Sequence, residues 1–336
     1  MASLTPSVNR PASFSWGRVF IYTVLITGAI ISVIPFIHMI MTSLKSYGSV
    51  VNLNLWPWAP FGDEPLQWQN YPDAIAAAGT DRLWNMPLVV RYFINSIIIT
   101  ASTVFGVLIT SILAAYTFAY IDVPGKNILF MLVLATIMIP SDLTLVPKVV
   151  MMFQWKWYNT YAALIVPFLV SVFGIFLMRQ FFMQIPRDLF DAALIDGGGH
   201  LQYLLYVVVP LSRPAIITTA LLNFIFAWDS FKWPLLVTRD SSMRVLAVGL
   251  QQFMASEGGT KIHLLLAFAG MVVIPVIVFY FFTQKYFTEA LLNTNEGKSI
   301  GLSYFKERGL SDYIIQKFQL GYAPEARTVF TDKALK

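Results

Sequence analysis

The chain has 336 residues, of which 57% are hydrophobic and 12% are charged, and its formal net charge is +5. Soluble domains carry about 25% charged residues, so this composition argues against a soluble protein and for apolar surface that faces lipid. The absence of cysteine excludes disulfides and cysteine-ligated metal centres, and no Lys/Arg run with interleaved aromatic residues suggests a nucleic-acid partner.

Six stretches are long and apolar enough to cross a hydrocarbon core, which takes about 20 residues of helix. In chain order they are residues 20–41, 94–119, 128–147, 160–178, 215–237 and 264–284. The runs are continuously apolar, which favours helices over the alternating strands of a transmembrane barrel. We therefore expect an all-α integral membrane protein with six transmembrane helices in a domain of residues 19–287.

The first span and the loop after it come next in the chain. Residues 20–41 are too long for a signal-peptide core and no small-residue cleavage pattern follows, so we expect a retained span. Residues 42–93 are hydrophilic and should form an external loop that contains Trp56, Trp58, Trp68 and Trp84. Two interpretations stay open for this loop: an aromatic belt packed on the bundle, or a docking surface for an extracytoplasmic partner.

Two spans carry charged residues, Asp142 in the third and Asp229 with Lys232 in the fifth. Ionisable residues inside a membrane are usually paired, cavity-facing or functional. Lys232 follows Asp229 by three residues, so the two can pair on one helix face. With the neighbouring aromatic residues they resemble a sugar site; alternatively, the charges reach the outer interface and the tryptophans belong to the aromatic belt.

The connection between the fourth and fifth spans, residues 179–214, predicts a helix, a tight turn and a second helix. Pro186 suits the first turn of a helix, and an apolar face follows at helical spacing, Leu189, Phe190, Ala193 and Leu194. Three glycines, 197–199, end that helix. A second amphipathic stretch then runs to Pro210 and Pro214, with its apolar residues at Leu201, Leu204, Leu205 and Val208.

The orientation follows from Lys and Arg, which are retained on the cytoplasmic side. Arg10, Arg18, Lys126, Arg179, Arg187 and Arg213 all precede or connect spans on one side. We therefore expect residues 1–18, the 179–214 loop and a C-terminal extension of residues 288–336 in the cytoplasm. In that extension, residues 311–321 predict one short helix.

Candidate catalytic and metal sites are absent from the sequence patterns. His38, His200 and His263 are isolated and have no metal-ligand spacing, and no set of nucleophile, base and orienting residue points to an enzyme. Gly297-Lys298-Ser299 is not a phosphate-binding loop, because Leu292 stands where that loop needs its first glycine.

Within the 179–214 loop, Asp191-Ala192-Ala193-Leu194-Ile195-Asp196-Gly197, followed by Pro210 and Pro214, resembles the EAA signature of ABC importer permeases. It departs from that signature at Asp191, Gly198 and Val209, where the family usually has Glu, Ala and Leu. The resemblance extends from about residue 22 to residue 287 and is closest to maltose-transporter-type permeases of the carbohydrate uptake class. The other segments that show this resemblance are residues 91–96, 114–116, 228–234, 250–253 and 284–287.

The resemblance implies a type I ABC importer permease fold whose EAA loop forms a coupling helix. The residues implied to contact the ATPase are Asp191, Ala192, Ala193, Asp196, Gly197, Gly198 and Pro210. The residues implied to line the substrate pathway are Asn95, Asp142, Asn223, Trp228, Asp229, Phe231 and Trp233.

The resemblance also implies the assembly. A second permease subunit, a paralogue similar to the partner subunit of the maltose transporter, would pair with this chain in the bacterial inner membrane. A dimer of ATPase subunits would bind ATP and Mg, so that this chain holds no cofactor. A periplasmic or lipid-anchored binding protein would deliver a sugar, oligosaccharide or polyol. An ion-coupled secondary carrier or channel is the alternative function, and residues 289–336 either lie against the ATPase or form a solvated extension.

Overall fold

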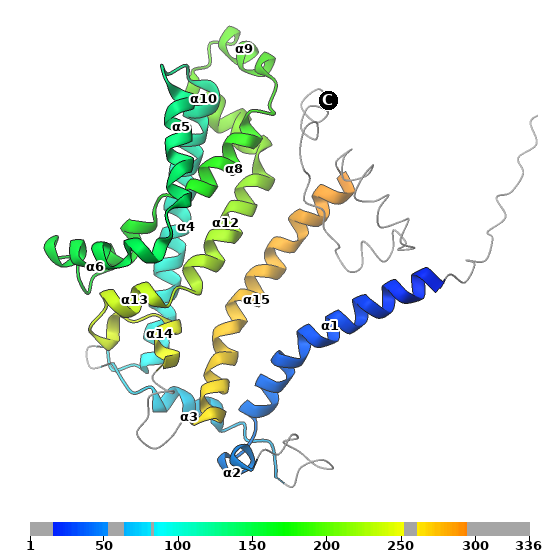
Figure 1. Cartoon of the computed structure of the whole chain (residues 1–336), viewed down its shortest axis with the longest axis vertical. Helices are drawn as coiled ribbons and strands as arrows, with labels where there is room; N and C mark the ends of the chain where they lie inside the picture. The colour runs from blue at the N-terminus through cyan, green and yellow to red at the C-terminus, as the bar shows by residue number, and fades with distance from the viewer. Residues whose placement is uncertain (1–15, 53–63, 82–83, 252–260, 294–336) are drawn as a thin grey trace, which may run out of the picture.

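In the computed structural model, which describes residues 16–52, 64–81, 84–251 and 261–293, the regular structure is helical (Figure 1). The helices are α1 (Trp16–Ser43), α2 (Tyr47–Val51), α3 (Asn70–Ala77), α4 (Leu88–Tyr120), α5 (Lys126–Ala135), α6 (Leu145–Gln154), α7 (Tyr161–Ile165), α8 (Val172–Phe182), α9 (Arg187–Ile195), α10 (His200–Tyr203), α11 (Val209–Leu211), α12 (Arg213–Trp228), α13 (Lys232–Val237), α14 (Leu246–Gln251) and α15 (Ile262–Asn293). The all-α prediction is confirmed. The predicted helix at 311–321 and the Gly297-Lys298-Ser299 stretch lie outside the described residues.

Four of the predicted spans are helical segments of sufficient length and hydropathy. They are Tyr22–Ser43, Leu88–Tyr120, Tyr161–Phe182 and Ile262–Phe282. The third of these segments contains α7 and α8, and Ser171 restarts the helix by accepting a hydrogen bond from the Gly174 N–H at 3.1 Å. Two further spans arise only if each of two bent helix pairs counts as one span, which gives up to six among the described residues.

The prediction of a continuous third span over 128–147 is wrong. The helical segment Lys126–Met138 ends at Pro140, and Ser141–Gln154 continues at 90° to it. Pro140 has no N–H to donate to the preceding turn, and it forces Ile139 into the extended region, with ψ at 113°. The helix α6 therefore lies across the direction of α5 rather than extending it (Figure 1).

The fifth span, predicted over 215–237, is also interrupted. The helix α12 ends at Trp228, Asp229 caps it, and α13 begins at Lys232. At its other end, α12 is bent by 78° from the preceding segment His200–Leu211. The membrane-crossing part of this segment is therefore α12, with both charged residues of the predicted span at the break that follows it.

The longest helix, α4, holds the bundle together. It packs against α8, α12 and α14 (Figure 1). Its approach to α8 is close, because a Cβ on Gly174 would come 2.7 Å from the Ser111 Oγ. Small residues at such contacts allow membrane helices to pack without a hydrophobic driving force between them.

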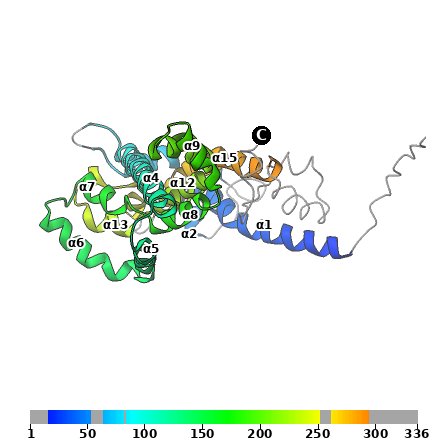
Figure 2. The same cartoon turned by 90° about the horizontal axis from the view of Figure 1, so that it is seen from above.

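The first helix, α1, leans away from this bundle in both Figure 1 and Figure 2. Its last turn is fixed, because the Asn70 amide donates to the carbonyls of Ser43 at 2.8 Å and Lys45 at 2.7 Å. The Ser43 and Tyr71 hydroxyls also lie 3.0 Å apart. The apolar side chains from Val24 to Ile40 remain largely exposed, so this helix requires lipid or another protein along its length.

The close contact between α14 and α4 gives a stability prediction. A Cβ on Gly249 would come 2.5 Å from the ring of the fully buried Tyr92, so we expect Gly249→Ala to destabilise the protein by about 1–3 kcal/mol through overpacking. Thermal unfolding in detergent, followed by tryptophan fluorescence, measures the loss. Gly270→Ala is the matched control, because nothing lies within 4 Å of its Cβ position; equal melting temperatures for the two variants would refute the packing argument.

Candidate functional site

The candidate site is the elbow, which we define as residues 187–211. Its first helix, α9, begins at Arg187, with Pro186 as the N-cap rather than inside the first turn. Asp188 is the acidic residue of the first turn, whereas Asp191 is the fifth residue of the helix. Asp191 therefore lies beyond the first turn of α9, whose free N–H groups favour a carboxylate.

A tight glycine turn ends α9. The Gly198 N–H donates to the Ala193 carbonyl at 2.8 Å and the Gly197 N–H donates to the Leu194 carbonyl at 3.0 Å, which is the Schellman pair of hydrogen bonds. Gly197 has φ +81°, a conformation that glycine adopts without strain. A Cβ on Gly198 would lie 2.9 Å from the Ala193 oxygen. The departure from the EAA signature at Gly198 thus coincides with a close backbone approach.

The second half of the elbow returns to the bundle. The Gln202 side chain accepts from the Gly199 N–H at 3.0 Å and so caps α10. A π-helical stretch, Leu204–Val208, follows and leads through Pro210 to the bend before α12. Leu204 and Val208 are buried, whereas Leu201 and Leu205, which are also four residues apart, are exposed. The four residues therefore lie on two faces rather than on the single apolar face that was predicted.

Five aromatic side chains fasten the elbow to the end of α4. The Tyr116 hydroxyl is hydrogen bonded to His200 Nδ1 at 2.9 Å, and the Tyr203 hydroxyl donates to the Tyr120 hydroxyl at 3.4 Å. The Phe190 ring lies 5.0 Å from the rings of both His200 and Tyr203. These contacts join α9 and α10 of the elbow to one helix.

Polar contacts beside this cluster add to the attachment. The Tyr120 hydroxyl donates to the Phe182 carbonyl, just before the elbow, at 2.9 Å. In the turn after α4, Lys126 forms an ion pair with Asp122 at 2.8 Å. Lys126 holds the pKa of the Asp122 carboxyl below its usual value, and Arg187 of the elbow lowers it further. Arg187, at the start of α9, therefore interacts electrostatically with Asp122 in the turn between α4 and α5.

This aromatic cluster was not predicted from the sequence. His200 is isolated from other metal-ligating residues along the chain, and Tyr116 was named only within residues 114–116 of the resemblance. The available signal was the spacing of Tyr116 and Tyr120, four residues apart at the end of a span, together with aromatic residues on both sides of the glycine turn.

The tip of the elbow presents apolar side chains to the outside. Ile195 is 87% exposed and Leu194 is 48% exposed. Leu194 was predicted on one apolar face with Leu189, Phe190 and Ala193, but of these four only the other three pack toward the bundle. Ala192, Asp191 and Asp196 are also exposed. A small apolar knob bordered by carboxylates is typical of a surface that another protein covers.

Asn95, one of the predicted pathway residues, is fully buried and its amide is occupied. Its Nδ2 donates to the carbonyls of Ser242 at 2.7 Å and Arg244 at 2.9 Å, and its Oδ1 accepts from the Tyr161 hydroxyl at 2.6 Å. Asn95 therefore joins α4 to α7 and to the segment before α14. Asn223 is half-buried, and its amide donates to the Thr219 carbonyl at 2.8 Å.

The predicted aromatic residues do not form one ligand-facing surface. Trp228 is buried and its indole donates to the Val272 carbonyl of α15 at 3.3 Å. Trp233 is buried in another cluster, where its indole donates to the Ala163 carbonyl at 2.9 Å. Phe231 packs against that second cluster. Neither indole offers an exposed face for stacking on a sugar.

The charged residues of the spans pair differently from the prediction. The Lys232 ammonium lies 3.3 Å from the Asp142 carboxylate, rather than pairing with Asp229. Both side chains are 70% exposed, and Asp229 is exposed as well. The pair joins the two helix breaks, one after Pro140 and one after Trp228. Among the described residues, no group of three or more His, Asp or Glu side chains could hold a metal ion.

Comparisons with known proteins agree with this architecture. Residues 85–292 match the family model described as "Binding-protein-dependent transport system inner membrane component". The arabinooligosaccharides transport system permease protein AraQ of Halalkalibacterium halodurans is 30% identical over 263 residues, 78% of this chain and 90% of the relative. The sn-glycerol-3-phosphate transport system permease protein UgpE of Agrobacterium fabrum is 28% identical over 291 residues, 86% of this chain and 99% of the relative.

A solved structure has the same fold. It is a chain of a bacterial ABC transporter involved in the import of the acidic polysaccharide alginate, with a TM-score of 0.69 at 23% identity. The match covers 83% of this chain and 100% of that chain.

The three consecutive glycines of the elbow provide an internal comparison. We expect Gly197→Ala to strain the left-handed turn by about 1–2 kcal/mol and Gly198→Ala to push against the Ala193 carbonyl, whereas Gly199→Ala has open space at its Cβ position. Hydrogen exchange of α9 amides should therefore become faster in the first two variants and stay unchanged in the third. Equal exchange in all three would contradict the turn geometry.

Proposed function

The chain belongs to the family of inner membrane components of binding-protein-dependent transport systems, and we propose that it forms half of the translocation pathway of an ATP-binding-cassette importer. The observation that carries this proposal is the elbow, a rigidly fastened unit whose apolar tip is uncovered. Such a unit can transmit the motion of a soluble motor to the membrane helices. The family is one of transport permeases, so catalysis of ATP hydrolysis belongs to a separate subunit in this proposal.

The residues proposed to contact the ATPase divide into two groups. Asp191, Ala192 and Asp196 are exposed and available for direct contact, together with Ile195. Gly197 and Gly198 act indirectly, because they form the turn that positions these exposed residues. Pro210 lies where the elbow returns to the bundle. In this arrangement the elbow side is cytoplasmic, ATP and Mg bind to the partner ATPase dimer, and both chain termini are cytoplasmic.

The substrate pathway is proposed to follow the face that carries Asp142, Lys232 and Asp229. A charged pair at membrane depth is costly when it faces lipid, so an exposed pair requires water or a polar partner surface. A second permease subunit of related fold would cover this face and complete the pathway. Asn95, Asn223, Trp228, Phe231 and Trp233 support that face from inside the chain.

The proposed substrate is a sugar, oligosaccharide or polyol-type solute, delivered by a periplasmic or lipid-anchored binding protein. Support comes from the relatives, whose names specify arabinooligosaccharides and sn-glycerol 3-phosphate. Both are hydroxyl-rich solutes. An ion-coupled carrier or channel, the alternative, needs no ATPase, and the following experiment separates the two functions.

We expect Ile195→Ser to reduce substrate-stimulated ATP hydrolysis at least about tenfold, because truncating a central apolar anchor typically costs more than 1 kcal/mol of binding. The measurement uses proteoliposomes that contain this chain, its partner permease and its ATPase. Val123→Ser, an exposed apolar residue in the turn after α4, is the matched control and should retain activity. Solute uptake that persists with an ATPase-dead partner would refute the importer proposal.

The ion pair tests the pathway. We expect Asp142→Asn and Lys232→Gln each to lower solute uptake several-fold, and the charge-swapped double variant, Asp142→Lys with Lys232→Asp, to recover part of the loss, because the pair would be restored. Lys156→Gln, which removes the charge of an exposed lysine outside the pair and outside the elbow, is the matched control and should leave uptake unchanged. Strictly additive losses at positions 142 and 232 would contradict a coupled pair in the pathway.

A further inference from the structure

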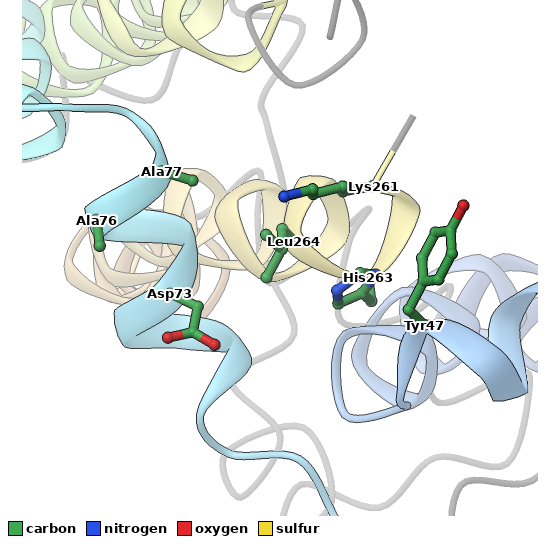
Figure 3. A pocket seen from close by; sticks show the side chains of 7 residues that line it. All are labelled: Tyr47, Asp73, Ala76, Ala77, Lys261, His263 and Leu264. Atoms are coloured by element: carbon green, nitrogen blue, oxygen red, sulfur yellow. The ribbon is translucent and has the colours of Figure 1, made fainter. Parts of the chain in front are cut away.

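A second polar site lies at the opposite end of the molecule from the elbow. A cavity of about 550 Å³ opens between α2, α3 and the first turn of α15 (Figure 3). Its lining is Tyr47, Asp73, Ala76, Ala77, Lys261, His263 and Leu264. None of these residues contributes to the elbow or to the proposed pathway face, so the proposed function leaves the cavity unexplained.

His263 is the unusual member of this lining. Its side chain lines the cavity although the residue is only 9% exposed. Its Nδ1 is buried and has no hydrogen-bond partner among the described residues. A buried polar atom without a partner costs about 1–3 kcal/mol. To meet a ligand in the cavity, this nitrogen has to turn out of its buried position about the Cβ–Cγ bond, which is a broad torsion.

One lysine and the start of a long helix lie at the same opening. Lys261 directly precedes α15, a helix of 32 residues. The Leu265 N–H donates to the Lys261 carbonyl at 2.9 Å, so the N–H groups of residues 262–264 lie at the open, positive end of the helix dipole. Lys261, the helix end and His263 together favour an anionic group.

Asp73 adds an acceptor on the opposite wall. Its Oδ1 accepts from the Gln69 side chain at 3.1 Å, which leaves its Oδ2 to accept a hydroxyl. In Figure 3, Asp73 borders the opening from α3, facing the first turn of α15 that carries His263 and Lys261. A simple anion such as phosphate would meet this carboxylate at a cost, whereas a ligand that also carries hydroxyl groups would donate to it.

The geometry points to a binding site for a small hydroxylated anion, of the class of polyol phosphates and sugar acids, at the end of the chain opposite the elbow. The anionic group would lie at Lys261 and the start of α15, with His263 donating to it, and the hydroxyls would lie at Asp73. This inference goes beyond the proposed function, and it rests on that proposal only for the statement that the cavity faces outward.

Selective labelling provides a direct test, because the chain has three histidines. The full chain with ¹³C-labelled histidine is placed in phosphatidylcholine nanodiscs and titrated with sn-glycerol 3-phosphate, glycerol or inorganic phosphate. We expect glycerol 3-phosphate to shift the His263 signal and to leave the His38 and His200 signals in place. Glycerol and phosphate, each lacking half of the recognised chemistry, should bind at least about tenfold more weakly.

Substitutions assign the contacts. Lys261→Gln and Asp73→Asn should each weaken binding about tenfold, and Lys156→Gln, an exposed lysine on another segment, should leave it unchanged. Each histidine signal is assigned by its His→Gln variant. No shift of the His263 signal with millimolar glycerol 3-phosphate would overturn the proposal, and so would equal binding of glycerol.

A lipid headgroup has related chemistry and needs its own comparison. If phosphatidylglycerol nanodiscs shift the His263 signal and the free solute does not, the site belongs to lipid and the proposal is overturned. Failure here leaves the importer function untouched, because ATP hydrolysis and solute uptake are measured independently in the assembled transporter.

Discussion

The attachment of the elbow to α4 is the constraint on which the proposed function depends. α4 contains no proline, whereas the other spans contain Pro35, Pro140, Pro167, Pro214 or Pro275. An uninterrupted helix of 33 residues is a stiff connection. One end of α4 carries Tyr116 and Tyr120, which hold the elbow, and the other carries Tyr92 and Asn95, which hold α14 and the segment before it. In the proposed importer, a displacement of the elbow would be conveyed along this one element to the far end of the bundle.

The sequence predicts the helical membrane fold well because length and hydropathy are the physical requirements for crossing lipid. It predicts helix continuity poorly. The run 128–147 is apolar enough for a span, and hydropathy averaged over about 19 residues does not detect the local effect of Pro140. This proline lacks the N–H that a continuous helix needs, and it restricts the backbone of Ile139. The residues Pro140-Ser141-Asp142 indicate the end of one helix and the start of another, so this break could have been predicted from the local sequence. The 90° angle that follows depends on packing and was not.

The candidate site divides in the same way. The glycine turn of the elbow follows from local backbone chemistry, and both Schellman hydrogen bonds lie where consecutive glycines allow them. The roles of Trp228 and Trp233 could not be derived locally, because a continuously apolar helix has no polar face to indicate which side meets the core. Their indole N–H groups bond to carbonyls of α15 and α7, contacts between segments far apart in the sequence. The ion-pair partner of Lys232 was missed for the same reason, since Asp142 is 90 residues away.

The helix breaks near Pro140 and after Trp228 have the same physical requirements. Each break frees backbone N–H and C=O groups that lipid cannot satisfy, and each carries a charged residue that lipid cannot solvate. The contact between Asp142 and Lys232 places the breaks side by side, so both unsatisfied features occur on one face of the chain. A lipid-facing surface would have to meet both costs at once. In the proposed importer, a water-filled pathway or a polar subunit interface on this face would avoid both costs, so the broken helices and the ion pair favour the same surroundings.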